Sequence, residues 1–285
     1  MIDDIHIVAK YLERGPGKVV STLRKGLKTL GVNEVPVEDT NNIACLQWGD
    51  DWPNVDTFSG KHVLIGPNYE SKKFENVASR LDNFIVPSQW VKNIHAIDPI
   101  INKKNIHVWS GGIETEVWTP TSQDKDISCI VYLKNRSREE YMRLEKIAAK
   151  LPSLFSRAAV FHYGMYDEAD FFECAKRAKF AILLTNTESQ GYAYMQLLSA
   201  GVPCLVFNKD SFYHKESDKL LNATSVPYFD DRCGMVTNDI TKEAIEEFLS
   251  FSYTRWSPRD YILENHTIEK STTRYLELLK NTSPL

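Results

Sequence analysis

The residues best suited to chemistry lie in one polar stretch, Thr187-Glu188-Ser189-Gln190-Gly191. Glu188 supplies a carboxylate, which can accept hydrogen bonds from hydroxyl groups or take part in acid–base chemistry. An unbroken apolar run, Phe180 to Leu184, precedes the stretch and is too short for an isolated helix. We therefore expect a strand that is buried on both faces and ends just before these polar residues.

The residues that follow predict a helix and a second strand. Tyr192, Met195 and Leu198 recur on one helical face, and Gly201 supplies a C-terminal stop. Another short apolar run, Cys204 to Phe207, comes directly afterwards. This order predicts a strand–helix–strand unit whose two strands are parallel and joined by a right-handed crossover.

Such a unit places the polar stretch at the carboxyl edge of a parallel sheet, where ligands of open α/β sheets bind. Free backbone N–H groups and the helix dipole favour an anion at this edge. Glu188 then lies where a phosphate-sugar would bind, and Gly191 lets the backbone approach it closely. In the alternative interpretation, Glu188 only begins a helix, since acidic residues are common in first turns.

The composition limits the class of protein. The chain has 285 residues, of which 42% are hydrophobic and 25% charged, as is typical of globular proteins with one large or two modest domains. A formal net charge of −4 argues against a general nucleic-acid-binding protein. No apolar segment approaches the length needed to span a bilayer.

The cysteines and histidines indicate the cellular compartment of the protein and whether it binds a metal or another cofactor. Five scattered cysteines without a Cys-x-x-Cys pair predict free thiols in a reducing compartment, the cytoplasm. Asp3 and Asp4 interrupt the apolar stretch that a secretory signal requires. The seven histidines are dispersed, and Asp124-Lys125-Asp126 lies in an expected linker, so we expect neither a metal nor another cofactor.

The rest of the chain alternates short apolar runs with polar turns, as in an α/β protein. Strands are expected at 5–9, 43–46, 62–65, 84–87, 106–109, 127–133 and 159–163. A loop at Gly15-Pro16-Gly17 precedes a helix that closes at Gly31. Ser257-Pro258 is a good helix start, and apolar residues through Leu279 predict one long terminal helix.

The central unit resembles the signature of retaining GT-B glycosyltransferases of family four. The resemblance rests on Glu188-Ser189-Gln190-Gly191, the helix after it and Ala200-Gly201-Val202-Pro203. In that family a Glu, seven residues and a second Glu contact the sugar and the ribose of the donor. Glu188 stands at the first Glu, but Gln196 stands at the second. Glutamine can still hydrogen-bond a ribose hydroxyl, although it is uncharged.

Segments on either side resemble other parts of the family. The glycine loop at 15–17 resembles the first loop, which lies near the donor phosphates and the acceptor, and residues 110–120 resemble the hinge between domains. Lys134 and Arg136 stand where the family has basic residues that hold the diphosphate, whose charge grows as it departs. Tyr163-Gly164-Met165-Tyr166 resembles the loop that cups the base.

The resemblance implies an α/β fold of two Rossmann-like domains that face each other across a cleft. Residues 1–118 would form the acceptor domain and 119–256 the donor domain, with a C-terminal helix at 257–285 packing back on the first. The implied catalytic residues are Glu188, Lys134 and Arg136. The implied donor contacts are Gly15, Gly17, Tyr163, Gly164, Met165, Ser189, Gln190, Gly191, Tyr192 and Gln196.

The implied function is that of a retaining hexosyltransferase in glycan biosynthesis. It would move a sugar from a nucleotide-sugar, a UDP- or GDP-sugar, to a hydroxyl of a glycan or small acceptor without a metal. One alternative is a non-catalytic GT-B-like protein that binds a nucleotide or glycan, which Gln196 and the compact length favour. Another is a glycoside hydrolase, which needs a second carboxylate that the sequence does not place relative to Glu188.

Overall fold

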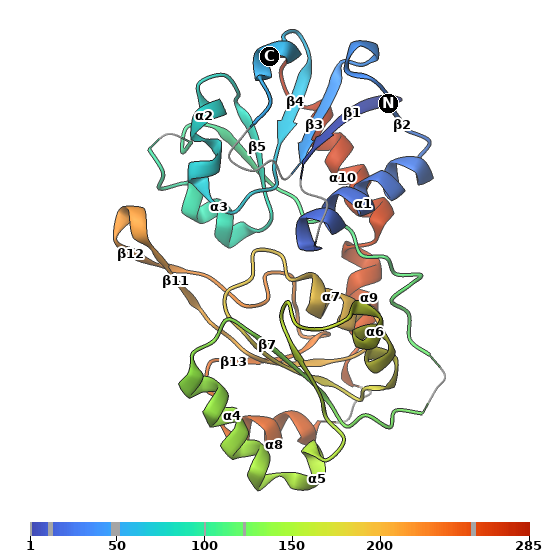
Figure 1. Cartoon of the computed structure of the whole chain (residues 1–285), viewed down its shortest axis with the longest axis vertical. Coiled ribbons are helices and arrows are strands. Elements are labelled where there is room, and N and C mark those ends of the chain that lie inside the picture. The colour runs from blue at the N-terminus through green and yellow to red at the C-terminus, as the bar shows by residue number, and fades with distance from the viewer. Residues whose placement is uncertain (1, 11–13, 47–51, 100, 122–123, 252–254) are drawn as a thin grey trace. The chain divides into compact units, whose positions relative to one another are not determined.

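The computed structural model describes residues 2–10, 14–46, 52–99, 101–121, 124–251 and 255–285. The chain divides into two compact units (Figure 1). Unit 1 comprises Met1–Gly112 and Asn265–Leu285, and unit 2 comprises Ile113–Glu264. The chain therefore passes between the units twice, once after Gly112 and once after Glu264.

Within the described residues of unit 1, six parallel strands form one sheet in the order β2-β1-β3-β4-β5-β6. Their bounds are β1 (Asp4–Ala9), β2 (Asn33–Glu34), β3 (Asn42–Leu46), β4 (His62–Ile65), β5 (Asn83–Val86) and β6 (Asn105–Val108). The helices of this unit include α1 (Arg14–Thr29), α2 (Glu75–Ala78), α3 (Gln89–His95) and α10 (Ile268–Lys280). The expected strands of the first third are therefore confirmed.

The loop predicted at residues 15–17 is wrong. Helix α1 begins at Arg14, so Gly15, Pro16 and Gly17 lie in its first turn. Proline is tolerated in a first turn because the N–H groups there have no intrahelical acceptor to lose. The predicted end of the helix is confirmed: Gly31 has a φ of +72°, the left-handed conformation that closes helices at a glycine.

The single terminal helix that the sequence predicted is also wrong, because the chain forms α9 (Pro258–Asn265) in unit 2 and α10 in unit 1. The break lies at His266 and Thr267. Thr267 begins the second helix as its N-cap, with its hydroxyl accepting a hydrogen bond from the backbone N–H of Lys270. A side-chain cap satisfies a helix N–H that has no backbone partner, so a new helix can start after a gap of only two residues.

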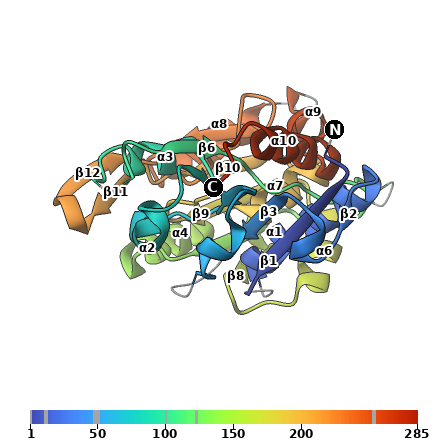
Figure 2. The same ribbon diagram turned by 90° about the horizontal axis from the view of Figure 1, so that it is seen from above.

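Helix α10 packs side by side with α1, as both views of unit 1 show (Figures 1 and 2). Tyr275 and Leu279 of α10 are fully buried, and Thr272 fills the space beside Gly26 of α1. A Cβ added at Gly26 would lie 1.8 Å from the Thr272 hydroxyl oxygen, so the two helices approach closely at this glycine. The last helix is thus part of the core of unit 1.

His266 makes the stability of unit 1 depend on pH. The ring is 6% exposed and lies 3.2 Å from the Ser110 hydroxyl through Nδ1. Burial, with a smaller contribution from the charge of Arg274, lowers the His266 pKa from 6.5 to about 4. A lowered pKa favours the neutral ring in the folded state, so its stabilisation is present above pH 6.5 and is lost as the pH falls towards 4.

We expect His266 to cost about 2 kcal/mol of the free energy of unfolding between pH 8 and pH 5. Urea unfolding at both pH values measures this loss, and His266→Asn should lose correspondingly less than the unmodified protein. His162→Asn, at an exposed histidine, is the control for replacing a histidine with asparagine. An unchanged pH dependence in His266→Asn would contradict the prediction.

In the part of unit 2 that the structure describes, five parallel strands form the main sheet in the order β13-β10-β9-β7-β8. Their bounds are β7 (Ile130–Lys134), β8 (Ala159–His162), β9 (Ala181–Thr185), β10 (Cys204–Phe207) and β13 (Gly234–Thr237). A separate antiparallel hairpin consists of β11 (Ser211–His214) and β12 (Lys219–Asn222). The sequence did not predict this hairpin.

Helices cover both faces of the unit 2 sheet. Ala181 and Leu183 face one core with α6 (Glu168–Arg177), α7 (Tyr192–Ser199) and α9, whereas Ile182 and Leu184 face another. The second core contains α4 (Arg138–Lys150), α5 (Pro152–Phe155) and α8 (Lys242–Ser250). Alternate residues of β9 therefore serve opposite faces, which explains its continuous apolar run. No helix among the described residues is both long and apolar enough to cross a membrane.

Candidate functional site

The carboxyl edge of the unit 2 sheet contains a topological switch point. Adjacent strands β7 and β9 are followed by helices on opposite faces, α4 and α7 respectively. Ligands of open α/β sheets bind where neighbouring connections diverge in this way. Lys134 is the last residue of β7, and Glu188 lies in the loop after β9, so both residues stand at this point. The predicted strand–helix–strand unit is confirmed, since β9 and β10 are parallel.

Lys134 and Glu188 form an ion pair at this edge. The Lys134 ammonium donates to Oε2 of Glu188 at 2.7 Å, and it also lies 4.2 Å from the ring centre of Tyr163. The Glu188 side chain is 8% exposed and the Lys134 side chain 20%. Burial raises the Glu188 pKa, while the charge and hydrogen bond of Lys134 oppose that shift. Lys134 thus favours the ionised carboxylate, against the effect of burial.

The loop after β9 is held by backbone contacts. The Glu188 N–H donates to the Thr224 carbonyl at 3.0 Å, and the Ser225 hydroxyl donates to the Thr185 carbonyl at 3.0 Å. Gln190 is 5% exposed, and its carbonyl accepts a hydrogen bond from the Tyr194 hydroxyl at 3.1 Å. The segment before Val226, for which the sequence predicted no chemistry, therefore braces the loop that carries Glu188.

Both the backbone conformation at position 191 and the space beside it require a glycine. Its φ is +89°, a left-handed value, and it is the N-cap of α7. A Cβ at this position would lie 2.0 Å from Cε1 of Tyr194, closer than any real contact. The Tyr194 hydroxyl in turn accepts the Tyr228 N–H at 3.1 Å. The glycine lets the ring of Tyr194 close under the start of the helix, which leaves the first N–H groups of α7 at the sheet edge.

Arg136 is buried at the carboxyl edge of the sheet and is not exposed on its surface. Its side chain is 3% exposed, and one terminal nitrogen donates to the carbonyls of Thr185 and Phe207 at 2.9 and 3.2 Å. The other terminal nitrogen pairs with Glu140 at 2.7 Å. Arg136 therefore holds together the ends of β9 and β10. This placement favours a structural role over the predicted contact with a diphosphate, and leaves Lys134 as the predicted cation.

Gln196 pairs with a residue that sequence reasoning missed. Its side chain is buried on α7, and its amide donates to Oε1 of Glu168 at 3.0 Å. Glu168 is exposed and begins α6, after the N-cap Asp167. An acidic residue in a first turn is an ordinary helix start, so the sequence carries no signal that Glu168 reaches α7.

The turn after β8 exposes the segment expected to cup a base. Tyr163 is 42% exposed and Met165 83%, and Gly164 has a φ of +77°. Burial raises the pKa of Tyr166, and the charges of Glu168 and Glu188 raise it further. The charges of both carboxylates therefore act on the Tyr166 side chain.

The structure brings most of the predicted site residues to this one edge of unit 2. They are Lys134, Tyr163, Gly164, Met165, Glu188, Ser189, Gln190, Gly191, Tyr192 and Gln196. Gly15 and Gly17 lie in unit 1, at the start of α1, and their contact with a donor stays a prediction. No three His, Cys, Asp or Glu side chains gather as metal ligands would in the described ranges. Asp126 of the Asp-x-Asp match pairs with Arg177 at 2.7 Å.

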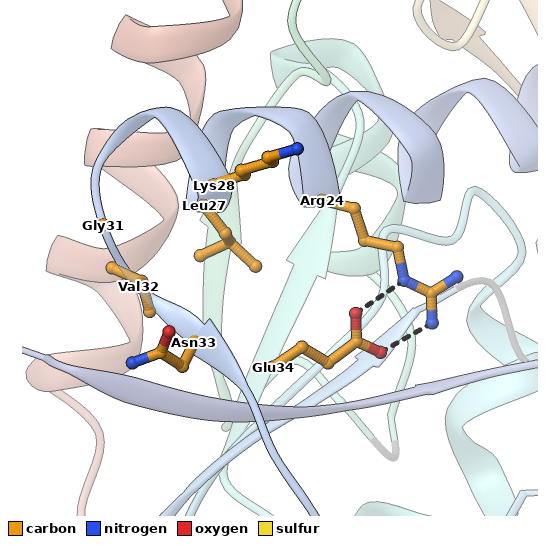
Figure 3. A pocket seen from close by; sticks show the side chains of 7 residues that line it. All are labelled: Arg24, Leu27, Lys28, Gly31, Val32, Asn33 and Glu34. Atoms are coloured by element: carbon orange, nitrogen blue, oxygen red, sulfur yellow. Dashed lines mark hydrogen bonds and ion pairs between the residues drawn. The ribbon is translucent and has the colours of Figure 1, made fainter.

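Unit 1 contains a separate pocket of about 300 Å³ (Figure 3). It lies between the end of α1 and β2, where Arg24 donates to both carboxylate oxygens of Glu34 at 2.8 and 2.7 Å. The C-terminal end of α1 stands at the amino edge of the parallel sheet. Ligands of such sheets bind at the opposite edge, and the arginine is already paired, so the candidate site is not here.

Two α/β units, each built on a parallel sheet, define a class of protein. The chain has the fold of GT-B glycosyltransferases. No protein-family model and no curated protein sequence matches the chain. The likeness lies in the fold, which many solved glycosyltransferase structures share.

Three of these structures illustrate the match. A glycosyltransferase from Rickettsia africae has a TM-score of 0.66 at 11% identity, over 97% of each chain. Anabaena HepE, solved with UDP and glucose, has a TM-score of 0.59 at 8% identity, over 99% of this chain and 100% of that one. Staphylococcus aureus TarM, solved with UDP, has a TM-score of 0.55 at 14% identity, over 92% of this chain and 59% of that one.

Proposed function

We propose that the protein is a retaining, metal-independent hexosyltransferase that moves a sugar from a nucleotide-sugar to a hydroxyl of a glycan or small acceptor. The observation that carries the proposal is the Lys134–Glu188 ion pair, 2.7 Å long, at the switch point beside the N-terminus of α7. It combines one cation, one carboxylate and the N-terminus of a helix. A nucleotide-sugar needs this combination, because it joins a diphosphate to a hydroxylated ring.

The diphosphate is assigned to Lys134 and the first N–H groups of α7. A departing nucleoside diphosphate gains negative charge as the bond to the sugar breaks. A cation and a helix N-terminus that are already in place stabilise this charge without reorganisation. The buried contacts of Arg136 fix the strand ends that carry Lys134 and the loop of Glu188.

Glu188 is assigned to the transferred sugar. An ionised carboxylate accepts hydrogen bonds from hydroxyls, and the ion pair with Lys134 favours that form, although burial raises the Glu188 pKa. In the proposed reaction the bond from the anomeric carbon to the phosphate oxygen breaks while the acceptor oxygen bonds on the same face. The acceptor proton passes to the departing phosphate oxygen, so atoms and charge balance and the configuration is retained.

Calorimetric titration with UDP, GDP and their hexose conjugates tests the donor assignment. UDP comes first because HepE and TarM, which share the fold, were solved with it. We expect one nucleotide-sugar to bind in the presence of a chelator, and Glu188→Ala to weaken that binding. No binding by any member of the panel would contradict the proposal.

Product analysis separates the transferase from its alternatives. Incubation with the bound nucleotide-sugar and a panel of glycan and small hydroxyl acceptors should release nucleoside diphosphate and form a product with the donor's anomeric configuration. Tight donor binding without any transfer would support the non-catalytic alternative that Gln196 favours. Inverted configuration would contradict retention while leaving transfer intact.

A further inference from the structure

The contact between Gln196 and Glu168 adds a charge that residue 196 itself lacks. The Gln196 side chain is 5% exposed, and its amide is held at 3.0 Å from Oε1 of Glu168. Glu168 belongs to another helix and is exposed to solvent. A buried amide therefore positions a solvent-facing carboxylate at the same edge of the sheet as Lys134 and Glu188.

The charge of the Glu168 carboxylate determines whether it can bind a phosphate or hydroxyl groups. It repels a phosphate, but its two oxygens can accept hydrogen bonds from two neighbouring hydroxyls. Glu168 begins the helix after β8 and Glu188 lies in the loop after β9, so both stand at the same carboxyl edge, and the charges of both act on Tyr166. Glu188 pairs with Lys134 at the end of β7, whereas Glu168 begins the helix that follows the exposed turn at Tyr163.

This arrangement matches the two ends of a nucleotide-sugar, which has a hydroxylated ring on each side of its diphosphate. With Glu188 assigned to the transferred sugar, the remaining ring is the ribose, which carries neighbouring 2′- and 3′-hydroxyls. Building on the proposed function, we propose that Glu168 binds the ribose of the donor and that Gln196 holds Glu168 in place. Gln196 then holds the Glu168 side chain in place, and Glu168 supplies the negative charge.

The experiment compares binding of UDP, or of GDP if it binds more tightly, with binding of its 2′-deoxy and 3′-deoxy analogues. Glu168→Gln keeps the shape of the side chain and removes its charge. We expect it to weaken binding of the ribonucleotide about 10- to 100-fold, the range for a lost hydrogen bond to a charged group. The loss should shrink for a deoxy analogue, because the hydroxyl that Glu168 binds is already absent.

Exchanging the side chains at positions 168 and 196 separates a loss of nucleotide binding from a loss of the fold. Gln196→Glu alone places two carboxylates in contact and should also weaken binding. The double variant Glu168→Gln/Gln196→Glu restores the contact between one carboxylate and one amide, but its charge lies at the buried position 196, so it should fold normally without recovering the affinity. Glu173→Gln is the matched control on the same helix, where Glu173 pairs with Lys176 at 2.7 Å, and should bind as the unmodified protein does.

Each outcome decides between the two proposals. Unchanged ribonucleotide binding by Glu168→Gln, or an equal loss with the deoxy analogues, would overturn the role of Glu168 and leave the donor site intact. Failure of the unmodified protein to bind any nucleotide would overturn the proposed function and the ribose contact with it.

Discussion

Exchange of Lys134 for methionine is expected to lower the rate of sugar transfer about 10²- to 10³-fold, the usual cost of removing one group that stabilises transition-state charge. Methionine keeps much of the side-chain volume but leaves the diphosphate without its cation. It also removes the cation beside the buried Glu188, so the Glu188 pKa should rise further and the neutral form should be favoured. Steady-state kinetics with the donor found by titration measures the loss.

Lys176→Met is a closely matched control for this exchange. Lys176 also forms an ion pair, with Glu173 at 2.7 Å, and also lies over an aromatic ring, that of Phe172 at 4.0 Å. Its side chain is 19% exposed, against 20% for Lys134. Because Lys176 lies in the last turn of α6, its loss should leave the transfer rate within about twofold. Equal losses in the two variants would contradict the assignment of Lys134 to the diphosphate.

Gly191→Ala is expected to destabilise the protein by about 3 kcal/mol and to abolish donor binding. Alanine disfavours a φ of +89°, and its methyl group would displace the Tyr194 ring. The ring could then keep neither its hydrogen bond to the Gln190 carbonyl nor that from the Tyr228 N–H. Urea unfolding measures the first effect, and calorimetric titration at a temperature where the variant is folded measures the second.

Gly164→Ala separates backbone strain from the clash. Gly164 has a similar φ of +77°, but no atom lies within 4 Å of the position its Cβ would take. We expect this variant to lose only about 1 kcal/mol, the cost of the left-handed conformation alone. If both variants lost the same stability, the contact between Gly191 and Tyr194 would contribute nothing to the site.

The local elements of the site could be predicted from the sequence. The apolar run before Thr185, the helical spacing after Gly191 and the stop at Gly201 are all patterns of neighbouring residues. Each depends on which residues face a core or end a helix, and these preferences act over a few positions. For this reason β9, α7 and β10 lie where the sequence predicted them.

The errors arose where a local pattern had two solutions. Gly15-Pro16-Gly17 suits either a loop or the first turn of a helix, and only the placement of α1 against α10 shows which is formed. Apolar residues on both sides of His266 suit one long helix. The division into units, and the cap supplied by Thr267, make two helices instead.

The sequence by itself determined the strands and the helix around the site, the polar loop with Glu188 and the likeness to a glycosyltransferase signature. Only the tertiary structure decided the partners of the charged and polar groups. Lys134 meets Glu188 across 54 positions of the chain, and Gln196 meets Glu168 across 28. Such pairs depend on which strand ends become neighbours in the sheet. That outcome is set by packing of the whole unit, not by the residues adjacent in sequence.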